Sequence, residues 1–142
     1  MKILLLNGPN LNLLGQRQVE IYGNQSFENY FKEVRSLFSV HQLVYFQSNH
    51  EGVLIDQLHQ ARHDFDAVVF NPGAYAHTSV ALADAIRSIN IPVIEVHISN
   101  IHARETYRNH SFTAASCKGI ISGLGLEGYR LAILSLIQSE IP

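Results

Sequence analysis

The sequence has no tryptophan, one cysteine, one methionine and only three lysines among its ten basic residues. Cys117, as the only cysteine, cannot form an internal disulfide, which favours a reducing compartment. The apolar opening after Lys2 is too short for the core of a signal peptide, and no apolar run approaches the length of a membrane span. Together these absences predict a cytoplasmic protein.

Charge is also scarce. Charged residues make up 15% of the chain, the formal net charge is −2, and there is no run of like charges. This balance argues against a nucleic acid or a membrane surface as the partner and favours a small neutral molecule or an anion. The 142 residues suffice for one hydrophobic core, and neither a repeat nor a linker interrupts them. We therefore expect a single domain over residues 1–142.

Apolar runs alternate with helical patterns along the chain, an order typical of βαβ units around a parallel sheet. Short apolar runs predict five strands, over residues 2–7, 42–47, 66–71, 92–97 and 119–122. Apolar residues at helical spacing predict four helices, over residues 26–38, 52–63, 79–89 and 126–138. This order predicts an α/β fold, a flavodoxin-like, doubly wound, five-stranded parallel sheet in the order 2-1-3-4-5 with helices on both faces.

In such a sheet the ligand crevice lies outside the carboxyl ends of the strands, where the strand order reverses, here between strands one and three. That rule selects residues 8–23, 72–78 and 98–108. Proton transfer beside an anionic substrate needs an acid, a base, orienting amides and hydroxyls, and a guanidinium. These segments and the adjoining strand ends hold such a set: Asn7, Asn10, Asn12, Arg17, Tyr22, Asn71, His77, His97, Ser99, His102, Arg104 and Arg108.

The stretch GQRQVEIYG, residues 15–23, places an arginine and a tyrosine between two glycines. A phenol is a poor base near neutrality because its ordinary pKa is about 10. A nearby guanidinium favours the phenolate, so Arg17 and Tyr22 are candidates for a charge-tuned base. We expect this stretch to be a glycine-hinged lid over the crevice. The alternative is an exposed arginine and a tyrosine that only packs.

His97 ends the fourth predicted strand, and Glu95 lies two residues earlier on the same face. A carboxylate in that position can hold the imidazole in one tautomer and keep it cationic, which suits a general acid. The competing interpretation is a structural histidine whose hydrogen bonds are satisfied at a strand end.

Five stretches of the sequence carry a family resemblance. In their order and spacing they resemble the type II 3-dehydroquinate dehydratases, essentially from end to end: NGPNLNLLGQRQVEIYG (7–23), QSNHEG (47–52), NPGAYAHTS (71–79), EVHISNIHARETYRNHS (95–111) and GIISGLGLEGYRLAI (119–133). The resemblance implies a hydro-lyase that converts 3-dehydroquinate reversibly to 3-dehydroshikimate, the third step of the shikimate pathway. It implies anti elimination through an enolate, without a cofactor, a metal or a covalent intermediate.

The same resemblance implies a role for each site residue. Tyr22 matches the phenolate base and Arg17 the arginine that favours its charge. His97 matches the general acid, with Glu95 behind it, and Asn12 positions a water near the enolate oxygen. The substrate would be held by Asn71, His77, the backbone of Ile98, Ser99 and Arg108. Asp84, on the third predicted helix, would reach the site of a neighbouring subunit in a dodecamer built from trimers.

The sequence departs from the family pattern at three positions that have no catalytic role. Val19 stands where a proline is common, so we expect a more flexible lid. Asn109 stands where histidine is common, and Val53 where an acidic residue is common.

Several other motifs in the sequence are better explained by a structural role than by a functional one. GLGLEG (123–128) matches a dinucleotide motif but is not on the first βα turn, so we expect turn and packing glycines. His59 and His63 have zinc-helix spacing without the glutamate, which favours a solvated helix face, and His102 and His110 have no assigned role. The three lysines lie in segments away from the predicted crevice, which disfavours a Schiff-base route: Lys2, Lys32 and Lys118.

Non-enzymatic modules with the same fold are the main alternatives. A phospho-receiver needs an aspartate pair after strand one and a lysine after strand five, where Asn7 and Ser122 stand. A flavin carrier would have a Ser/Thr-rich phosphate loop in place of GPNLNLLG. A catalytically dead sugar-acid binder is disfavoured because Tyr22, Arg17 and His97 are all present.

Overall fold

The computed structural model of the chain describes residues 1–16 and 18–138. Its centre is one parallel sheet in the order β2-β1-β3-β4-β5, which confirms the predicted flavodoxin-like fold and strand order. The strands are β1 (Lys2–Asn7), β2 (Gln42–Gln47), β3 (Ala67–Asn71), β4 (Val93–His97) and β5 (Gly119–Ser122). Because β1 and β3 are neighbours, the connections after them diverge at the carboxyl edge of the sheet, as the crevice prediction requires.

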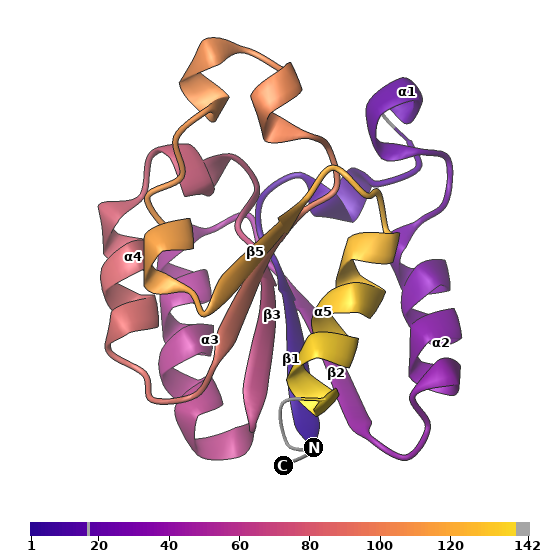
Figure 1. The fold of residues 1–142 in the computed structure, drawn as a ribbon, viewed down its shortest axis with the longest axis vertical. Helices are drawn as coiled ribbons and strands as arrows, with labels where there is room; N and C mark the ends of the chain where they lie inside the picture. The colour runs from indigo at the N-terminus through magenta and orange to yellow at the C-terminus, as the bar shows by residue number, and fades with distance from the viewer. Residues whose placement is uncertain (17, 139–142) are drawn as a thin grey trace.

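Two helices cover each face of the sheet (Figure 1). α2 (Phe27–Leu37) and α5 (Glu127–Gln138) pack on one face, where Ile3 and Leu5 of β1 lie with Tyr129 in one buried cluster. α3 (Glu51–Asp64) and α4 (Val80–Arg87) pack on the other face, against the alternate β1 residues Leu4 and Leu6. The continuous apolar run of β1 therefore reflects burial on both faces.

The ends of the elements follow their local chemistry. Ser26 Oγ accepts from the amide of Asn29 and so caps α2. The predicted start of strand four is one residue early, because Pro92 has no amide hydrogen for the ladder and β4 begins at Val93. Strand three is also predicted one residue early: β3 begins at Ala67, and Asp66 before it contacts Lys2 through both its backbone amide and its side chain.

Several short helices in the connections were not predicted. The predicted lid, residues 15–23, contains the one-turn helix α1 (Val19–Tyr22), which stands above the carboxyl edge of the sheet in Figure 1. In the described part of the chain, five 3-10 helices occupy other connections: η1 (Leu11–Leu13), η2 (Gly73–His77), η3 (Ile101–Ala103), η4 (Thr106–Arg108) and η5 (Ala114–Ser116). Each is too short to show a helical period in the sequence.

The glycines of GLGLEG serve turn geometry and packing, as predicted. Gly123 and Gly125 have φ angles of +90° and +61°, in the left-handed region that glycine adopts freely. A Cβ on Gly128 would lie 3.1 Å from Cγ1 of Val96, so the small residue lets α5 approach the sheet. Within the described residues, no helix is both long and apolar enough to cross a membrane.

Candidate active site

A crevice of about 100 Å³ lies at the carboxyl edge of the sheet, where the three predicted segments converge. The ends of β3 and β4 and the two residues that follow β4 contribute one group of predicted site residues to its wall: Asn71, His97, Ile98 and Ser99. The lid and the loops after those strands deliver a second group: Tyr22, His77 and Arg108. Predicted site residues that are far apart in the sequence therefore line one cavity.

Tyr22 ends α1, and its phenol oxygen accepts a 2.8 Å hydrogen bond from Nη1 of Arg104. The same nitrogen lies 3.3 Å from Oγ of Ser99, so one guanidinium links the lid to the loop after β4. The predicted partner of Tyr22, Arg17, lies outside the described residues. The sequence places Arg104 in a segment of the predicted crevice but indicates no role for it. Only the structure reveals its contact with the phenol.

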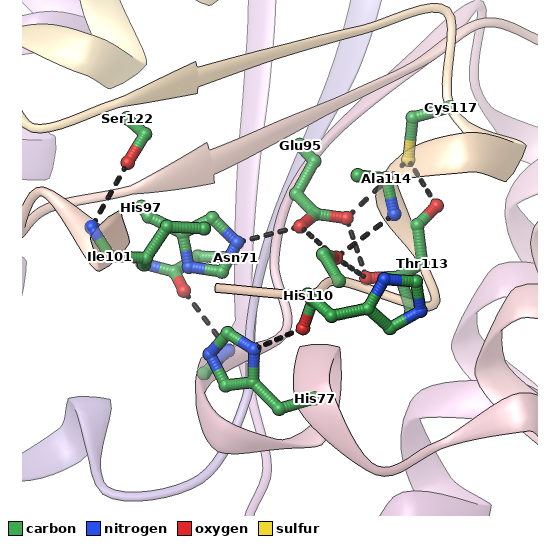
Figure 2. Close-up of polar contacts among 12 residues, drawn as sticks. Asn71, His77, Glu95, His97, Ile101, His110, Thr113, Ala114, Cys117 and Ser122 are labelled. Carbon is green, nitrogen blue, oxygen red and sulfur yellow. Dashed lines mark hydrogen bonds and ion pairs between the residues drawn. The ribbon is translucent and has the colours of Figure 1, made fainter. Parts of the chain in front are cut away.

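His97 and Glu95 form the predicted pair, with Nε2 of His97 2.6 Å from Oε1 of Glu95 (Figure 2). Glu95 has no exposed surface. Burial opposes its charge, but hydrogen bonds from His97, Thr113 and Ser111 outweigh burial and hold the pKa of the Glu95 carboxyl below its ordinary value. An ionised carboxylate is thus fixed behind an imidazole that lines the crevice.

His77 stacks on His97 with 6.1 Å between ring centroids. Burial lowers the pKa of His77, and the positive charges of His97 and Arg108 lower it further. The hydrogen bond to the His110 carbonyl raises this pKa but does not outweigh the other effects. The ring is therefore neutral near neutral pH. Since its Nδ1 lies 2.7 Å from that carbonyl, Nδ1 carries the hydrogen and Nε2 is left as an acceptor. His77 thus suits a ligand hydroxyl.

A buried polar chain fixes Asn71 beneath the crevice. Nδ2 of Asn71 donates to the hydroxyl of Tyr129 at 2.8 Å, and that hydroxyl donates to Oδ1 of Asn7 at 2.8 Å. The amide of Gly73 donates to Oδ1 of Asn71 at 3.0 Å. Because Nδ2 carries two hydrogens, one remains for a ligand. Tyr129 belongs to α5 and was not predicted as a site residue, since its role depends on contacts with β1 and β3.

Arg108 lines the crevice and pairs with Glu105, three residues earlier, at 2.7 Å. The Glu105 backbone amide and the Arg108 guanidinium hold the pKa of the Glu105 carboxyl at about 2. Glu105 is half exposed, so water screens this pair and Arg108 can exchange it for a ligand.

The sequence matches the family model described as Dehydroquinase class II over residues 1–137. The chain belongs to the class II dehydroquinase family. It is 54% identical to the 3-dehydroquinate dehydratase of Bacillus pumilus (strain SAFR-032), with 95% of this chain and 93% of that protein covered. Class II dehydroquinases are hydro-lyases, so the chain is an enzyme.

Two solved class II dehydroquinases share its fold closely. The crystal structure of the type II dehydroquinase from Butyrivibrio crossotus DSM 2876 is 46% identical, with a TM-score of 0.92 over 96% of this chain and 97% of that one. The type II dehydroquinase from Propionibacterium acnes is 42% identical, with a TM-score of 0.91 over 95% of this chain and 94% of that one. These likenesses extend over nearly the whole chain.

Besides Glu95, which is buried behind His97, two described residues predicted for the site of this class II dehydroquinase do not line its crevice. Asn12 is exposed in η1, and Nε2 of Gln47 lies 3.5 Å from its Oδ1, the limit of a weak hydrogen bond. Asp84 is exposed on α4 and forms an ion pair with Arg87 of the same helix. Within a single chain, neither residue therefore reaches the crevice lining.

The remaining histidines of this class II dehydroquinase stay outside the crevice lining. His59, His63 and His102 are exposed, and His63 accepts from Nε of Arg62 at 2.9 Å. Over residues 1–16 and 18–138, no group of three His, Cys, Asp or Glu side chains is placed to hold a metal ion. His110 contributes its backbone carbonyl to His77, a contact that sequence spacing did not indicate.

Proposed function

We propose that this chain dehydrates 3-dehydroquinate to 3-dehydroshikimate, reversibly, as the third step of the shikimate pathway, within one catalytic domain over residues 1–142. The observation that carries the proposal is a single crevice lined by both a guanidinium-bound phenol, Tyr22, and a carboxylate-bound imidazole, His97. An elimination of water needs one group to remove a proton and another to give one to the departing hydroxyl. The family to which the chain belongs supports this substrate.

The first step is removal of a proton α to the ketone by the phenolate of Tyr22. The electron pair of the broken C–H bond moves toward the carbonyl and forms an enolate. Arg104 supports this role, because a guanidinium hydrogen-bonded to the phenol oxygen favours the charged base. Arg17 retains its proposed role beside the same phenol, and Asn12 is proposed to position a water near the enolate oxygen.

The second step is collapse of the enolate with loss of the hydroxyl. His97 donates a proton to the leaving oxygen, and water departs anti to the proton taken by Tyr22. Glu95 supports this role because its buried negative charge favours the imidazolium. Both steps balance without a metal, a cofactor or a covalent adduct.

Substrate binding falls to the other residues of the crevice. Nε2 of His77 is free to accept from a hydroxyl, while the remaining hydrogen of Asn71 Nδ2 can donate. Ser99 and the backbone amide of Ile98 suit the substrate carboxylate, and Arg108 suits a ring hydroxyl.

Assembly of the chain as a dodecamer built from trimers belongs to the same proposal. Asp84 would enter the site of a neighbouring subunit, which fits its exposed position on a helix of small residues away from its own crevice. Mixed oligomers of Asp84→Asn and Tyr22→Phe chains should then be more active than either variant alone, because some sites regain both groups. A mixture no more active than its parts would contradict a shared site. The cytoplasmic location stays a prediction.

The experiment that tests the reaction is a spectrophotometric assay for the conjugated enone formed from 3-dehydroquinate, with borohydride added during turnover. We expect enone formation and no inactivation, because none of the described lysines lines the crevice. A lysine adduct trapped by borohydride would refute the non-covalent mechanism. His97→Gln should lose most of the rate, and a His97→Gln enzyme of normal rate would remove the proposed acid.

A further inference from the structure

The loop that follows β4 folds back over Glu95, behind His97. Ser111 Oγ donates to Oε1 of Glu95 at 2.8 Å. Thr113 Oγ1 donates to Oε2 of Glu95 at 2.6 Å (Figure 2). Neither Glu95 nor Thr113 has any exposed surface. Two hydroxyls and Nε2 of His97 therefore enclose the carboxylate, each within 2.8 Å of one of its oxygens.

The directions of these bonds follow from the number of hydrogens available. The amide of Ala114 donates to Ser111 Oγ at 3.1 Å, so the single hydroxyl hydrogen of Ser111 is free for Glu95. Thr113 also has one hydroxyl hydrogen, which its 2.6 Å contact with Glu95 uses. All three close partners are then donors. Only an ionised carboxylate accepts from all of them, because a protonated one would itself need an acceptor.

The other titratable groups around the pair do not compete for this charge. Sγ of Cys117 lies 3.8 Å from Oε2 of Glu95, and burial raises the pKa of the thiol, so it is at most a weak neutral donor. His77 stacks on His97, and burial lowers the pKa of His77, so its ring is neutral near neutral pH. The positive charge of Arg108, which lowers the pKa of His77, is paired with the carboxylate of Glu105.

We propose that Ser111 and Thr113 are positioning residues for the reaction, because their hydroxyls hold Glu95 ionised and in the one orientation that fixes the imidazole of His97. The inference rests on the role of His97 as general acid in the proposed function. With Nε2 committed to Glu95, Nδ1 is the nitrogen left to give a proton to the ligand. A merely structural pair of hydroxyls would stabilise the fold without affecting proton transfer.

The kinetic test compares Thr113→Val and Ser111→Ala with the wild type in the enone assay. Thr113→Val keeps the shape of the side chain and removes the donor. We expect kcat to fall about tenfold, since a hydrogen bond to a charged group contributes about that factor, while KM stays within about twofold. The acidic limb of the kcat profile should move to higher pH. Thr113→Ser should restore most of kcat, and Ser135→Ala, a hydroxyl deletion on α5, should match the wild type.

A second readout does not depend on activity. Infrared titration follows the carbonyl band of a protonated buried carboxyl group, assigned to Glu95 by its loss in Glu95→Gln. The band should appear at higher pH in Thr113→Val than in the wild type, because the lost hydroxyl favours the ionised form. Ser111→Ala should shift it in the same direction, which keeps the test available if Thr113→Val does not fold.

The outcomes separate this inference from the proposed function. The positioning role alone would be overturned if Thr113→Val and Ser111→Ala both gave the same kcat profile and infrared titration as the wild type while His97→Gln was inactive. An equal loss in Thr113→Ser and Thr113→Val would also overturn it, because the hydroxyl would then not be the cause. A His97→Gln enzyme of normal rate would contradict the proposed function itself, whatever the infrared titration shows.

Discussion

Nη1 of Arg104 donates a 2.8 Å hydrogen bond to the phenol oxygen of Tyr22, although 82 residues separate the two in the chain. The guanidinium carbon also lies 5.6 Å from the centroid of the Tyr22 ring. Arg104 follows β4 and Tyr22 ends α1, so this contact joins the lid to the loop that also carries Ser99. One guanidinium therefore contacts the phenol oxygen, the phenol ring and Ser99, and so connects the two segments at the crevice.

Arg104→Gln should lower kcat/KM by about 10- to 100-fold, the range for a lost hydrogen bond to a charged group. The loss should nearly vanish in a Tyr22→Phe background, because the main partner is then absent. A double-mutant cycle in the enone assay measures this coupling. Arg130→Gln is the matched control, since Arg130 forms an exposed pair with Glu127 on α5. Additive losses from Arg104→Gln and Tyr22→Phe would contradict the role.

Glu95 and His77 should make the folded protein less stable in acid. The folded-state pKa of Glu95 is below 4.5, so its contribution is fully present above that value and is lost as the pH falls through the lowered pKa. The pKa of His77 is below 6.5, so its neutral ring contributes fully above 6.5 and less as the pH falls. Urea unfolding should thus show stability declining in two stages on acidification.

Single variants assign the two stages. His77→Gln should remove the decline that begins below 6.5, and Glu95→Gln the decline that begins below 4.5, although both lower stability at neutral pH. Stability that rises on acidification through this range would contradict the lowered pKa values of both side chains.

Tyr129→Phe should test the buried chain beneath Asn71. Loss of the hydroxyl removes the partner of Nδ2 of Asn71 and of Oδ1 of Asn7, both buried, and should lower the free energy of unfolding by about 1–3 kcal/mol. Because Asn71 then has a less fixed side chain, KM should rise more than kcat falls. Urea unfolding and steady-state kinetics measure both effects. Tyr107→Phe is the control, since Tyr107 is 65% exposed. If Tyr129→Phe were as stable as this control, the hydrogen bonds of Tyr129 to Asn71 and Asn7 would not stabilise the fold.

The two glycines that bracket the lid should differ in their tolerance of alanine. Gly15 and Gly23 both have positive φ, at 87° and 79°, which costs a residue with a Cβ about 1–2 kcal/mol. A Cβ on Gly15 would also lie 2.9 Å from the backbone oxygen of Asn24, whereas Gly23 has nothing within 4 Å. Gly15→Ala should therefore reduce kcat/KM more than Gly23→Ala. Equal losses would show that the close approach at Gly15 has no bearing on the lid.

The sheet could be predicted because its strands are buried on both faces and separated by amphipathic helices. β1, β2 and β5 begin and end at the predicted residues. The helices α2, α3, α4 and α5 also lie within a residue or two of their predicted bounds. The one-turn helix α1 could not be predicted, because four residues are too few to show a helical period. So short a helix also depends on the segment that contains it.

Some contacts among the predicted site residues follow from the sequence, and others do not. Glu95 and His97 share a strand face, so period two was enough to pair them. Arg104 and Tyr22, or Tyr129 and Asn71, meet only after the chain folds, and spacing carries no signal for such contacts. Thr113 and Ser111 resemble ordinary loop residues in the sequence, and only their distances to Glu95 distinguish them.

The most direct test of the central claim is the rate of enone formation from 3-dehydroquinate by Tyr22→Phe, measured beside the wild type at equal enzyme concentration. The substitution removes the proposed base and leaves the ring that packs against the core. We predict a loss of about 10²- to 10⁴-fold in kcat, the contribution of a positioned general base, with the fold and the assembly unchanged. A Tyr22→Phe enzyme that forms the enone at the wild-type rate would contradict the assignment of Tyr22 as the base.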